Sequence, residues 1–375
     1  MSSNDTLERV ERIAAGVVAE HAVRLDKEGS FPTEAVRALG EAGLLGLLSS
    51  KDVGGMGLGP REAAFVVERV ARECASTAMV LCMHYAATAV IEKLGPEPVR
   101  RAIAAGEHLS TLAFSEPGSR SQFWAPLGTA TLTAAGRVRL DARKSWVTSA
   151  HAAQSYVWSS KPLAGAEAST LWLVPNPTAG IRVTDPFDGL GLRANDSSPV
   201  VAEDATVGTD AMLGEDGGGF STMLEIVLPY FNVLSSACSV GLMETATART
   251  AAHASAIGFQ HTGTTIADLP TVRAYIARMR TKTDMARTLW LDTIDAMEKG
   301  RADAVLRVLE TKAAAGETSV EVVDLAMRVC GGAAYRKDVG VERLFRDARA
   351  SQVMGPTTDV LYDFIGKAVC NMPVF

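Results

Sequence analysis

The sequence predicts an α+β protein of three parts: an N-terminal helical domain over residues 1–110, a central antiparallel β domain over 111–220, and a C-terminal four-helix bundle over 221–375. Hydrophobic residues recur at helical spacing at both ends of the chain. Between them lie short runs rich in Thr, Val, Trp and Leu, separated by Gly, Pro, Asn and Asp, which is typical of strands and turns. With 375 residues, the chain is also too long for one small core.

The N-terminal helices follow from the spacing of apolar side chains. An amphipathic first helix is indicated by Leu7, Val10, Ile13, Ala14, Val17 and Val18. A second helix opens within residues 31–36, where Thr33 is the predicted N-cap because its hydroxyl can accept a hydrogen bond from the first turn. Two further apolar segments, 63–74 and 76–94, are separated by little polar material, so we expect these helices to pack on one another.

The central domain is predicted from short runs of strand-forming residues. These runs are 130–133, 138–140, 155–158, 170–175 and 198–201. A Gly-rich loop over 214–219 then separates the central domain from the helices that follow.

Long helical segments return after this loop, at 221–256, 269–299, 302–330 and 356–368. Several are longer than the average helix of about 11–12 residues. Long helices that are apolar on more than one side usually form a bundle or a subunit interface, so we expect a homodimer or homotetramer.

Composition and charge argue against several classes of protein. Apolar residues make up 47% and charged residues 21%, as in soluble globular proteins, and a net charge of −6 offers no basic surface for nucleic acid. The N-terminus lacks both a signal-peptide core and an apolar span of about 20 residues. Five separated cysteines suit buried thiols, and the six histidines lack zinc-ligand spacing. We therefore expect a cytoplasmic protein without a metal, a membrane or a nucleic-acid partner.

Two segments of the central domain, a Gly- and Ser-rich turn and a Trp-x-Thr strand, carry a resemblance to a known family. Residues 112–121 read Leu-Ala-Phe-Ser-Glu-Pro-Gly-Ser-Arg-Ser, and residues 144–150 read Lys-Ser-Trp-Val-Thr-Ser-Ala. A Gly- and Ser-rich turn lets backbone N–H groups approach a ring or a phosphate. A Trp can cover one face of a ring, and a Thr two residues later shares the same face of a strand.

Together with residues 330–359, these segments resemble the acyl-CoA dehydrogenase family. The first is similar to Thr-Glu-Pro-Gly-x-Gly-Ser-Asp, the second to Lys-x-Trp-Ile-Thr-Asn, and Cys-Gly-Gly and Arg-Asp-Ala near the C-terminus are similar to the family signature. The match runs essentially end to end, and it implies the same three-part fold with FAD as cofactor. The resemblance implies cofactor contacts for Phe114, Ser115, Ser121, Trp146, Thr148, Gly331, Gly332, Thr357 and Asp359.

The sequence departs from the family at the catalytic base. In much of the family the base is the Glu of a Tyr-Glu-Gly-Thr segment, and alignment from Arg346-Asp347-Ala348 places Gly355 there. Other members carry the carboxylate on the helix that opens the C-terminal domain, which corresponds to Phe231 with Asn232 next. Neither position can accept a proton. The family's Arg-x-x-Phe-Gly motif also lacks its Arg in residues 257–263, so the cofactor phosphates would be held differently or more weakly.

Three other residues are candidate catalytic groups. His84 could act as acid or base near neutral pH, or it could be a hydrogen-bonded core histidine. The His84-Tyr85 pair also resembles the His-Tyr of related flavin monooxygenases. Tyr230 could supply a polar group to a pocket or could serve packing. Asp359 could be the base, a cofactor contact or a helix N-terminal residue.

The resemblance leaves three functions open. The first is an FAD-dependent oxidoreductase that oxidises an acyl thioester, bound to CoA or to a carrier protein, with a non-standard base; the family suggests an electron-transferring flavoprotein as acceptor. The second is a flavin-dependent monooxygenase or oxidase of a biosynthetic intermediate. The third is a catalytically inactive flavin-binding paralogue. No motif encodes the substrate itself.

Overall fold

The computed structural model describes residues 3–164 and 169–374, so residues 1–2, 165–168 and 375 lie outside the described part. Its contacts divide the chain into two compact units. The first comprises Met1–Val66, Ser76–Gly189 and Arg193–Phe231, and the second comprises Val67–Ala75, Leu190–Leu192 and Asn232–Phe375. The predicted boundaries at residues 110 and 220 differ from this division and stay a prediction.

The N-terminal part of the first unit is helical, as the spacing of apolar residues predicts. Its helices are α1 (Ser3–Ile13), α2 (Ala19–Glu28), α3 (Thr33–Glu41), α4 (Pro60–Ala71), α5 (Ala75–Leu94) and α6 (Glu97–Ala104), with a π-helical turn η1 (Ala14–Val18) between α1 and α2 and a 3₁₀ turn η2 (Lys51–Val53) before α4. One detail of the prediction is wrong. Pro32, and not Thr33, is the N-cap of α3, and no side chain caps this end.

The β part of the first unit consists of two four-stranded sheets with strand orders β1-β4-β5-β8 and β2-β3-β7-β6. The strands are β1 (Ser110–Ala113), β2 (Thr129–Leu132), β3 (Val138–Val147), β4 (Ser155–Ser160), β5 (Thr170–Pro175), β6 (Ile181–Val183), β7 (Ser198–Val207) and β8 (Met212–Leu213), with a 3₁₀ turn η3 (Thr209–Ala211) before β8. Pairing is antiparallel except between β1 and β4, which run parallel. Buried side chains from both sheets, including Tyr156, Trp158 and Trp172, form the core.

Strands β1, β6 and β8 do not appear among the sequence-predicted runs. All four residues of β1 are buried, so it shows no alternation of apolar and polar side chains. β6 and β8 have only three and two residues, too few to establish a pattern. The five predicted runs overlap β2, β3, β4, β5 and β7, so residues typical of strands identified both the buried strands and the half-exposed ones.

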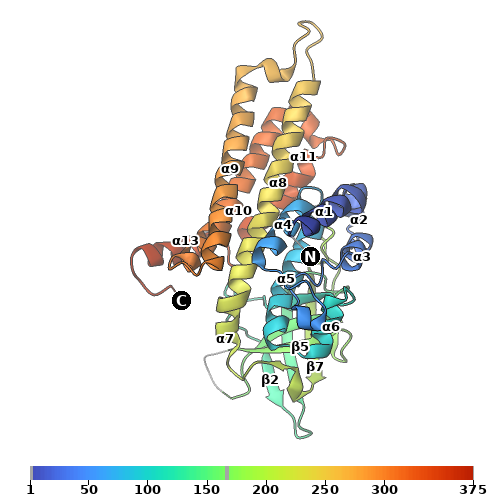
Figure 1. Cartoon of the computed structure of the whole chain (residues 1–375), viewed down its shortest axis with the longest axis vertical. Helices are drawn as coiled ribbons and strands as arrows, with labels where there is room; N and C mark the ends of the chain where they lie inside the picture. The colour runs from blue at the N-terminus through green and yellow to red at the C-terminus, as the bar shows by residue number, and fades with distance from the viewer. Residues whose placement is uncertain (1–2, 165–168, 375) are drawn as a thin grey trace. The chain divides into compact units, whose positions relative to one another are not determined.

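The second unit is a bundle of long helices. After α7 (Gly219–Thr222) and the π-helical turn η4 (Met223–Val227) come α8 (Leu228–Ala256), η5 (Ile266–Asp268), α9 (Pro270–Glu298), α10 (Ala304–Cys330), η6 (Gly331–Tyr335), α11 (Val341–Ala348), α12 (Ala350–Val353) and α13 (Thr358–Val369). Helix α10 packs against α9, α11 and α13, and Figure 1 shows α8, α9 and α10 side by side. Trp290 on α9 donates its indole N–H to the Val233 carbonyl on α8, at 3.1 Å.

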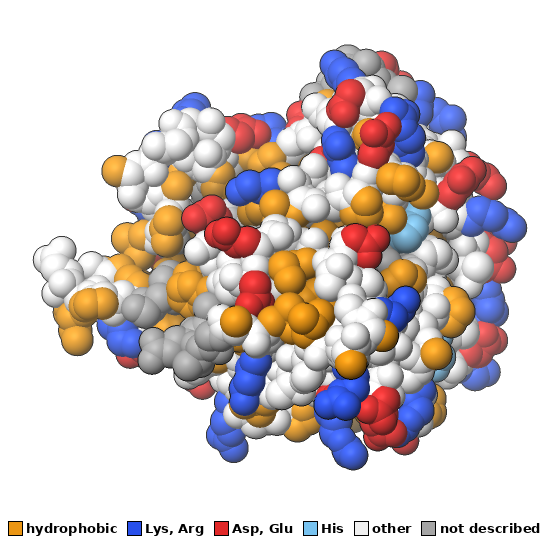
Figure 2. Space-filling view, turned by 90° about the horizontal axis from the view of Figure 1, so that it is seen from below, with side chains coloured by type: hydrophobic (Ala, Val, Ile, Leu, Met, Phe, Trp, Pro, Cys, Tyr) orange, Lys and Arg blue, Asp and Glu red, His pale blue; other side chains and the backbone are white. Residues whose placement is uncertain are grey.

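Two helical segments of the described chain, Ala75–Leu94 and Gly219–Ala256, are long and apolar enough to cross a membrane by length and composition alone. In each, 83% of the apolar window is buried inside the protein, which core helices of soluble proteins also show. Figure 2 shows charges of both signs interspersed on the face that it presents.

Candidate functional site

The two segments predicted to hold a planar ligand lie next to each other in the first unit. Residues 114–121 form the turn that leaves β1, and Trp146 stands near the end of β3. The Ser145 backbone N–H donates to the Ser115 carbonyl at 2.8 Å, which joins the turn to the strand directly. The structure therefore brings Ser115 and Trp146 together, although about thirty residues separate them in the sequence.

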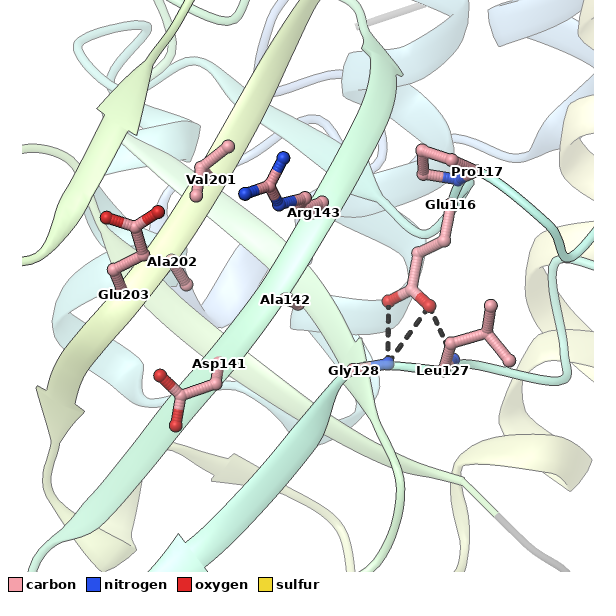
Figure 3. Close-up of a pocket in the computed structure, with 10 residues that line it drawn as sticks. All are labelled: Glu116, Pro117, Leu127, Gly128, Asp141, Ala142, Arg143, Val201, Ala202 and Glu203. Atoms are coloured by element: carbon pink, nitrogen blue, oxygen red, sulfur yellow. Dashed lines mark hydrogen bonds between the residues drawn. The ribbon is translucent and has the colours of Figure 1, made fainter.

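A buried ion pair braces this junction. Lys144 Nζ lies 2.6 Å from Glu116 Oε1 and also donates to the carbonyl and the hydroxyl of Ser159, at 2.7 and 3.0 Å. Burial lowers the pKa of Lys144 to about 8, while the Glu116 carboxylate acts in the opposite direction. The backbone N–H groups of Leu127 and Gly128 also donate to Glu116 (Figure 3). The Glu116 carboxylate therefore accepts hydrogen bonds from Lys144, Leu127 and Gly128. These bonds fix the turn at Ser115 to the strand that contains Lys144 and to the segment at Gly128.

Trp146 has the exposure and the backbone conformation that are common among ligand-binding aromatic residues. It is 69% exposed, although its strand neighbour Val147 is buried. Its φ of 58° lies in the left-handed region, which is unfavourable for a bulky residue. Its ring contacts the edge of Phe187, with centroids 6.4 Å apart. Strained, exposed aromatic residues of this kind are often found at ligand sites. The fold around them maintains an unfavourable backbone conformation that the packing of the core does not require.

The remaining predicted cofactor residues of the first unit surround this junction. Thr148 is buried, and its hydroxyl lies 3.0 Å from that of Ser197. Phe114 stacks on Phe123 with ring centroids 6.2 Å apart. Ser121 has a φ of 67°, which turns the chain sharply after the Pro-Gly pair. Phe114, Ser121 and the Ser115–Trp146 junction therefore belong to one small region of the first unit.

The other predicted cofactor residues belong to the second unit. Gly331 and Gly332 form the start of η6, and a β-carbon built at either would meet no atom within 4 Å. This open backbone suits close approach by a ligand. Thr357 is the N-cap of α13, although its side chain makes no capping bond. Asp359 is exposed in the first turn of α13, where a negative charge interacts favourably with the helix dipole.

The segment that contains Gly355 is held by a buried lysine. Lys312 on α10 is 2% exposed, and its ammonium donates to the carbonyls of Met354 and Pro356, at 3.0 and 2.6 Å. The two carbonyls flank Gly355, so the backbone around the family's base position is fixed by this contact. Sequence reasoning missed Lys312, because a single Lys within an otherwise apolar helix gives no local signal.

His84 does not have the environment of a catalytic base. It is fully buried, its Nδ1 accepts the backbone N–H of Ser110 at 3.1 Å, and its Nε2 lies 3.0 Å from the Leu45 carbonyl. This pattern requires a proton on Nε2, so neither nitrogen is left to accept one. Burial lowers the pKa of His84 to about 4. The arrangement favours the hydrogen-bonded core histidine, which the sequence also allowed, over a catalytic base.

Tyr85 completes the same contact. Its hydroxyl donates to the Leu44 carbonyl at 2.7 Å, so His84 and Tyr85 together attach α5 to the Leu44–Leu45 turn. Helix α5 is thereby joined to a segment about forty residues earlier in the chain. The pair that resembled the His-Tyr of flavin monooxygenases has a structural explanation here.

The remaining candidates differ in their chemistry. Tyr230 is half-buried, and burial raises its pKa, so its phenol stays protonated near neutral pH and can donate but not accept a proton. At the second family base position, Asn232 is fully buried and donates to the Val308 carbonyl at 3.2 Å. Of His84, Tyr230 and Asp359, only Asp359 has a carboxylate that solvent can reach.

A pocket of about 390 Å³ lies on the first unit, and sequence reasoning did not identify it (Figure 3). Asp141 and Arg143 on β3 and Glu203 on the adjacent strand β7 contribute its charges, and the Glu116–Gly128 contact forms one wall. Ser115 and Trp146 are not among the residues that line it, so this pocket differs from the predicted flavin position.

The described residues contain no cluster of three or more His, Cys, Asp or Glu side chains that could hold a metal ion. None of the five cysteines forms a disulfide, and Cys370 is the exposed one among them.

Comparison with known proteins places three consecutive segments in one family. Residues 3–106, 111–205 and 217–370 match the N-terminal, middle and C-terminal domains of acyl-CoA dehydrogenases. Cyclohex-1-ene-1-carbonyl-CoA dehydrogenase of Geobacter metallireducens (strain ATCC 53774 / DSM 7210 / GS-15) is 28% identical, over 97% of both chains.

Solved structures share the fold at lower identity. Butyryl-CoA dehydrogenase from Megasphaera elsdenii superimposes with a TM-score of 0.92 at 21% identity, over 99% of both chains. A prolyl acyl carrier protein oxidase gives a TM-score of 0.89 at 20% identity, over 98% of both chains. At these identities the likeness establishes the fold, and the predicted architecture of helices, β domain and helical bundle is confirmed.

Proposed function

This chain belongs to the acyl-CoA dehydrogenase family, and we propose that it is an FAD-dependent oxidoreductase that oxidises an acyl thioester. The thioester is bound to CoA or to a carrier protein, because relatives named for each kind of substrate share the whole fold. The observation that carries the proposal is the junction of Ser115 with the Trp146 strand, since it assembles the cofactor segments that the family signature predicts.

The residues present fit a flavin. The exposed ring of Trp146 would cover one face of the isoalloxazine, and the Ser115 turn would supply donors to its polar edge. In the second unit, Gly331 and Gly332 have an open backbone that suits close approach by a ligand, as the family signature implies for these positions. When bound, FAD supplies the chemistry of hydride acceptance.

The base of this enzyme is non-standard. Position 355 has no side chain, and Phe231 and Asn232 cannot take a proton at the second family position. His84 has both ring nitrogens occupied, and Tyr230 stays protonated because burial raises its pKa. Asp359 is the remaining candidate, since its carboxylate is exposed two residues after the Thr that matches the family's Tyr-Glu-Gly-Thr segment.

Anaerobic titration tests the proposal. The purified protein is examined for the absorbance of bound FAD and is then mixed with a panel of acyl-CoA and acyl-carrier-protein thioesters of different length and branching. Loss of the oxidised-flavin absorbance with one class identifies the substrate. The same titration with Asp359→Asn tests the base, and Asp363→Asn, one helical turn further along α13, is the matched control.

An oxidase or monooxygenase is the alternative function, because the family base is missing at Gly355. A monooxygenase predicts no absorbance loss with any thioester under anaerobic conditions, and an oxygenated product once the chemically reduced flavin is mixed with oxygen. An oxidase predicts the same anaerobic absorbance loss as a dehydrogenase, because its substrate also reduces the flavin, together with oxygen consumption during turnover. A protein that binds no FAD would contradict both enzymatic readings and would favour the inactive paralogue.

We propose a cytoplasmic homodimer or homotetramer that delivers its electrons to an electron-transferring flavoprotein. Exposed apolar side chains on the second unit, including Met285, Tyr335 and Val353, support self-association because such groups are usually covered. Light scattering on the purified protein measures the assembly, and a monomer would contradict it. Reduction of added electron-transferring flavoprotein, compared with oxygen uptake, identifies the acceptor.

A further inference from the structure

Two arginines of the second unit lie close together without a carboxylate to neutralise both of them. Arg249 is half-buried on α8, and Arg343 is 5% exposed on α11. The charge of Arg343 contributes, with burial, to lowering the pKa of Arg249, which places the two guanidinium groups within electrostatic range. Like charges in a partly buried place oppose folding unless something compensates them.

The buried arginine has an unused donor. Arg343 Nη2 donates to the Glu73 carbonyl at 2.8 Å, but its buried Nη1 has no hydrogen-bond partner among the described residues. Leaving a buried charged donor unsatisfied is costly, and most such groups in folded proteins do have a partner. A missing acceptor is therefore indicated next to Arg343 Nη1.

Arg249 lies against the beginning of the same helix. A β-carbon at Gly340 would collide with Arg249 Nη1, so its guanidinium lies directly over the N-cap of α11 (Val341–Ala348). The first N–H groups of a helix have no partner within the helix, and they carry partial positive charge. A cation at this end is unfavourable by itself, whereas an anion between the cation and the helix would be stabilised by both.

Nearby carboxylates already have other partners. Glu73 is 3.1 Å from Arg69, and Glu342 in the first turn of α11 is paired with Arg346 and Lys337, at 2.7 and 2.9 Å. Glu73 is the carboxylate whose charge partly offsets that of Arg343 at Arg249. Asp347, four residues after Arg343 on α11, accepts the Leu192 backbone N–H at 2.7 Å, and Arg343 Nη1 is still without a hydrogen-bond partner among the described residues.

We propose that Arg249, Arg343 and the N-terminus of α11 form a binding site for a phosphate group. Two guanidiniums and backbone N–H groups match the several acceptor oxygens of a tetrahedral oxyanion, and Arg is the side chain best suited to phosphate. The phosphate is either free or part of a larger molecule such as a nucleotide cofactor. This site does not depend on the proposed oxidation.

Thermal unfolding of the FAD-loaded protein tests the site, with inorganic phosphate compared with chloride at equal ionic strength. If the site takes free phosphate, about 10 mM phosphate raises the Tm by roughly 3 °C or more through mass action. Arg249→Gln is expected to abolish this rise and to weaken phosphate binding in calorimetry at least about tenfold. Arg273→Gln is the matched control, because Arg273 on α9 already donates to the carbonyls of Ala267 and Asp268.

A second arm identifies the source of the phosphate. If the cofactor's own phosphate fills the site, free phosphate leaves the Tm of the FAD-loaded protein unchanged, and Arg249→Gln weakens FAD binding about tenfold or more. Arg249→Glu places a carboxylate beside Arg343, and it is expected to raise the Tm without phosphate. The proposal is overturned if phosphate has no effect, FAD affinity is unchanged in Arg249→Gln, and Arg249→Glu lowers the Tm.

Discussion

Glu116 and Lys144 form an ion pair in the interior of the first unit, with Nζ and Oε1 2.6 Å apart and neither side chain more than 2% exposed. Glu116 belongs to the turn that contains Ser115, and Lys144 belongs to the strand that contains Trp146. The pair therefore fixes the spacing of the two segments on which the proposed flavin contact depends.

Removing one charge of this pair should destabilise the fold strongly. Glu116→Gln leaves the Lys144 ammonium buried without its counter-charge, so we expect a loss of about 3–5 kcal/mol in the free energy of unfolding. Retained FAD should fall in parallel. Denaturant titration measures the loss, and Glu97→Gln, which removes an exposed i,i+4 pair with Arg101, is the control that should change little. Equal effects of the two substitutions would contradict the bracing role.

His84 should contribute to the acid sensitivity of the fold. Burial lowers its pKa in the folded state to about 4 from 6.5, so the unfolded state takes up a proton first as the pH falls. Stability is thus fully present above about pH 6.5 and is lost as the pH falls towards about 4. Stability curves over this range should lose that slope in His84→Gln, while His261→Gln, in the exposed loop after α8, should keep it.

The same variant decides whether His84 is catalytic. Because both ring nitrogens are engaged, we expect His84→Gln to lower turnover less than about tenfold, against the ~10²–10⁴ typical of a general base. Steady-state turnover with FAD content measured on the same sample gives the answer. A drop of a hundredfold or more in folded, FAD-loaded protein would restore His84 as the base.

Placing a carboxylate at position 355 should create ordinary acyl-CoA dehydrogenation. Gly355→Glu introduces the group that the family uses, in a segment that Lys312 already holds in place. We expect faster anaerobic loss of flavin absorbance with acyl-CoA, and the isosteric Gly355→Gln should not show it because an amide cannot take the proton. If Glu and Gln behave alike, proton abstraction at this position does not limit the reaction.

Trp146 should matter for the cofactor and hardly for the fold. Its ring is 69% exposed, so Trp146→Ala removes little buried surface. The expected loss is about three- to tenfold in FAD affinity, corresponding to one lost aromatic contact. Fluorescence titration of stripped protein measures it, with Leu132→Ala, also exposed on the β part, as control. Unchanged FAD affinity would show that Trp146 does not face the flavin.

Lys312 should be required to hold the segment around Gly355. Lys312→Met preserves volume but leaves the Met354 and Pro356 carbonyls without their donor, so we expect a loss of roughly 2–4 kcal/mol in the free energy of unfolding. Lys367→Met on α13 removes an exposed pair with Asp363 and should change little. Proteolysis near residue 355 should be faster in Lys312→Met only, and similar rates in both variants would contradict the positioning role.

Much of the fold was determined by local pattern. Helical spacing of apolar residues predicted the long segments that became α8, α9 and α10, because each buries a continuous stripe of its own side chains. Runs of strand-forming residues predicted β2, β3, β4, β5 and β7, and they missed the short strands β1, β6 and β8. The helix α11 also went unassigned, although its sequence carries the family signature.

The sequence by itself determined that position 355 has no carboxylate. That Ser115 and Trp146 hold one ligand stays a prediction, and the structure shows that the two segments are joined by a hydrogen bond. Only the tertiary structure decided what the isolated polar residues do. His84 is satisfied by Leu45 and Ser110, Lys312 by carbonyls near residue 355, and Arg343 is left with an unused donor. The role of a polar side chain depends on its burial and on partners that are distant in the chain. The periodicity of apolar residues, which predicts helices, depends only on residues that are near one another in the sequence.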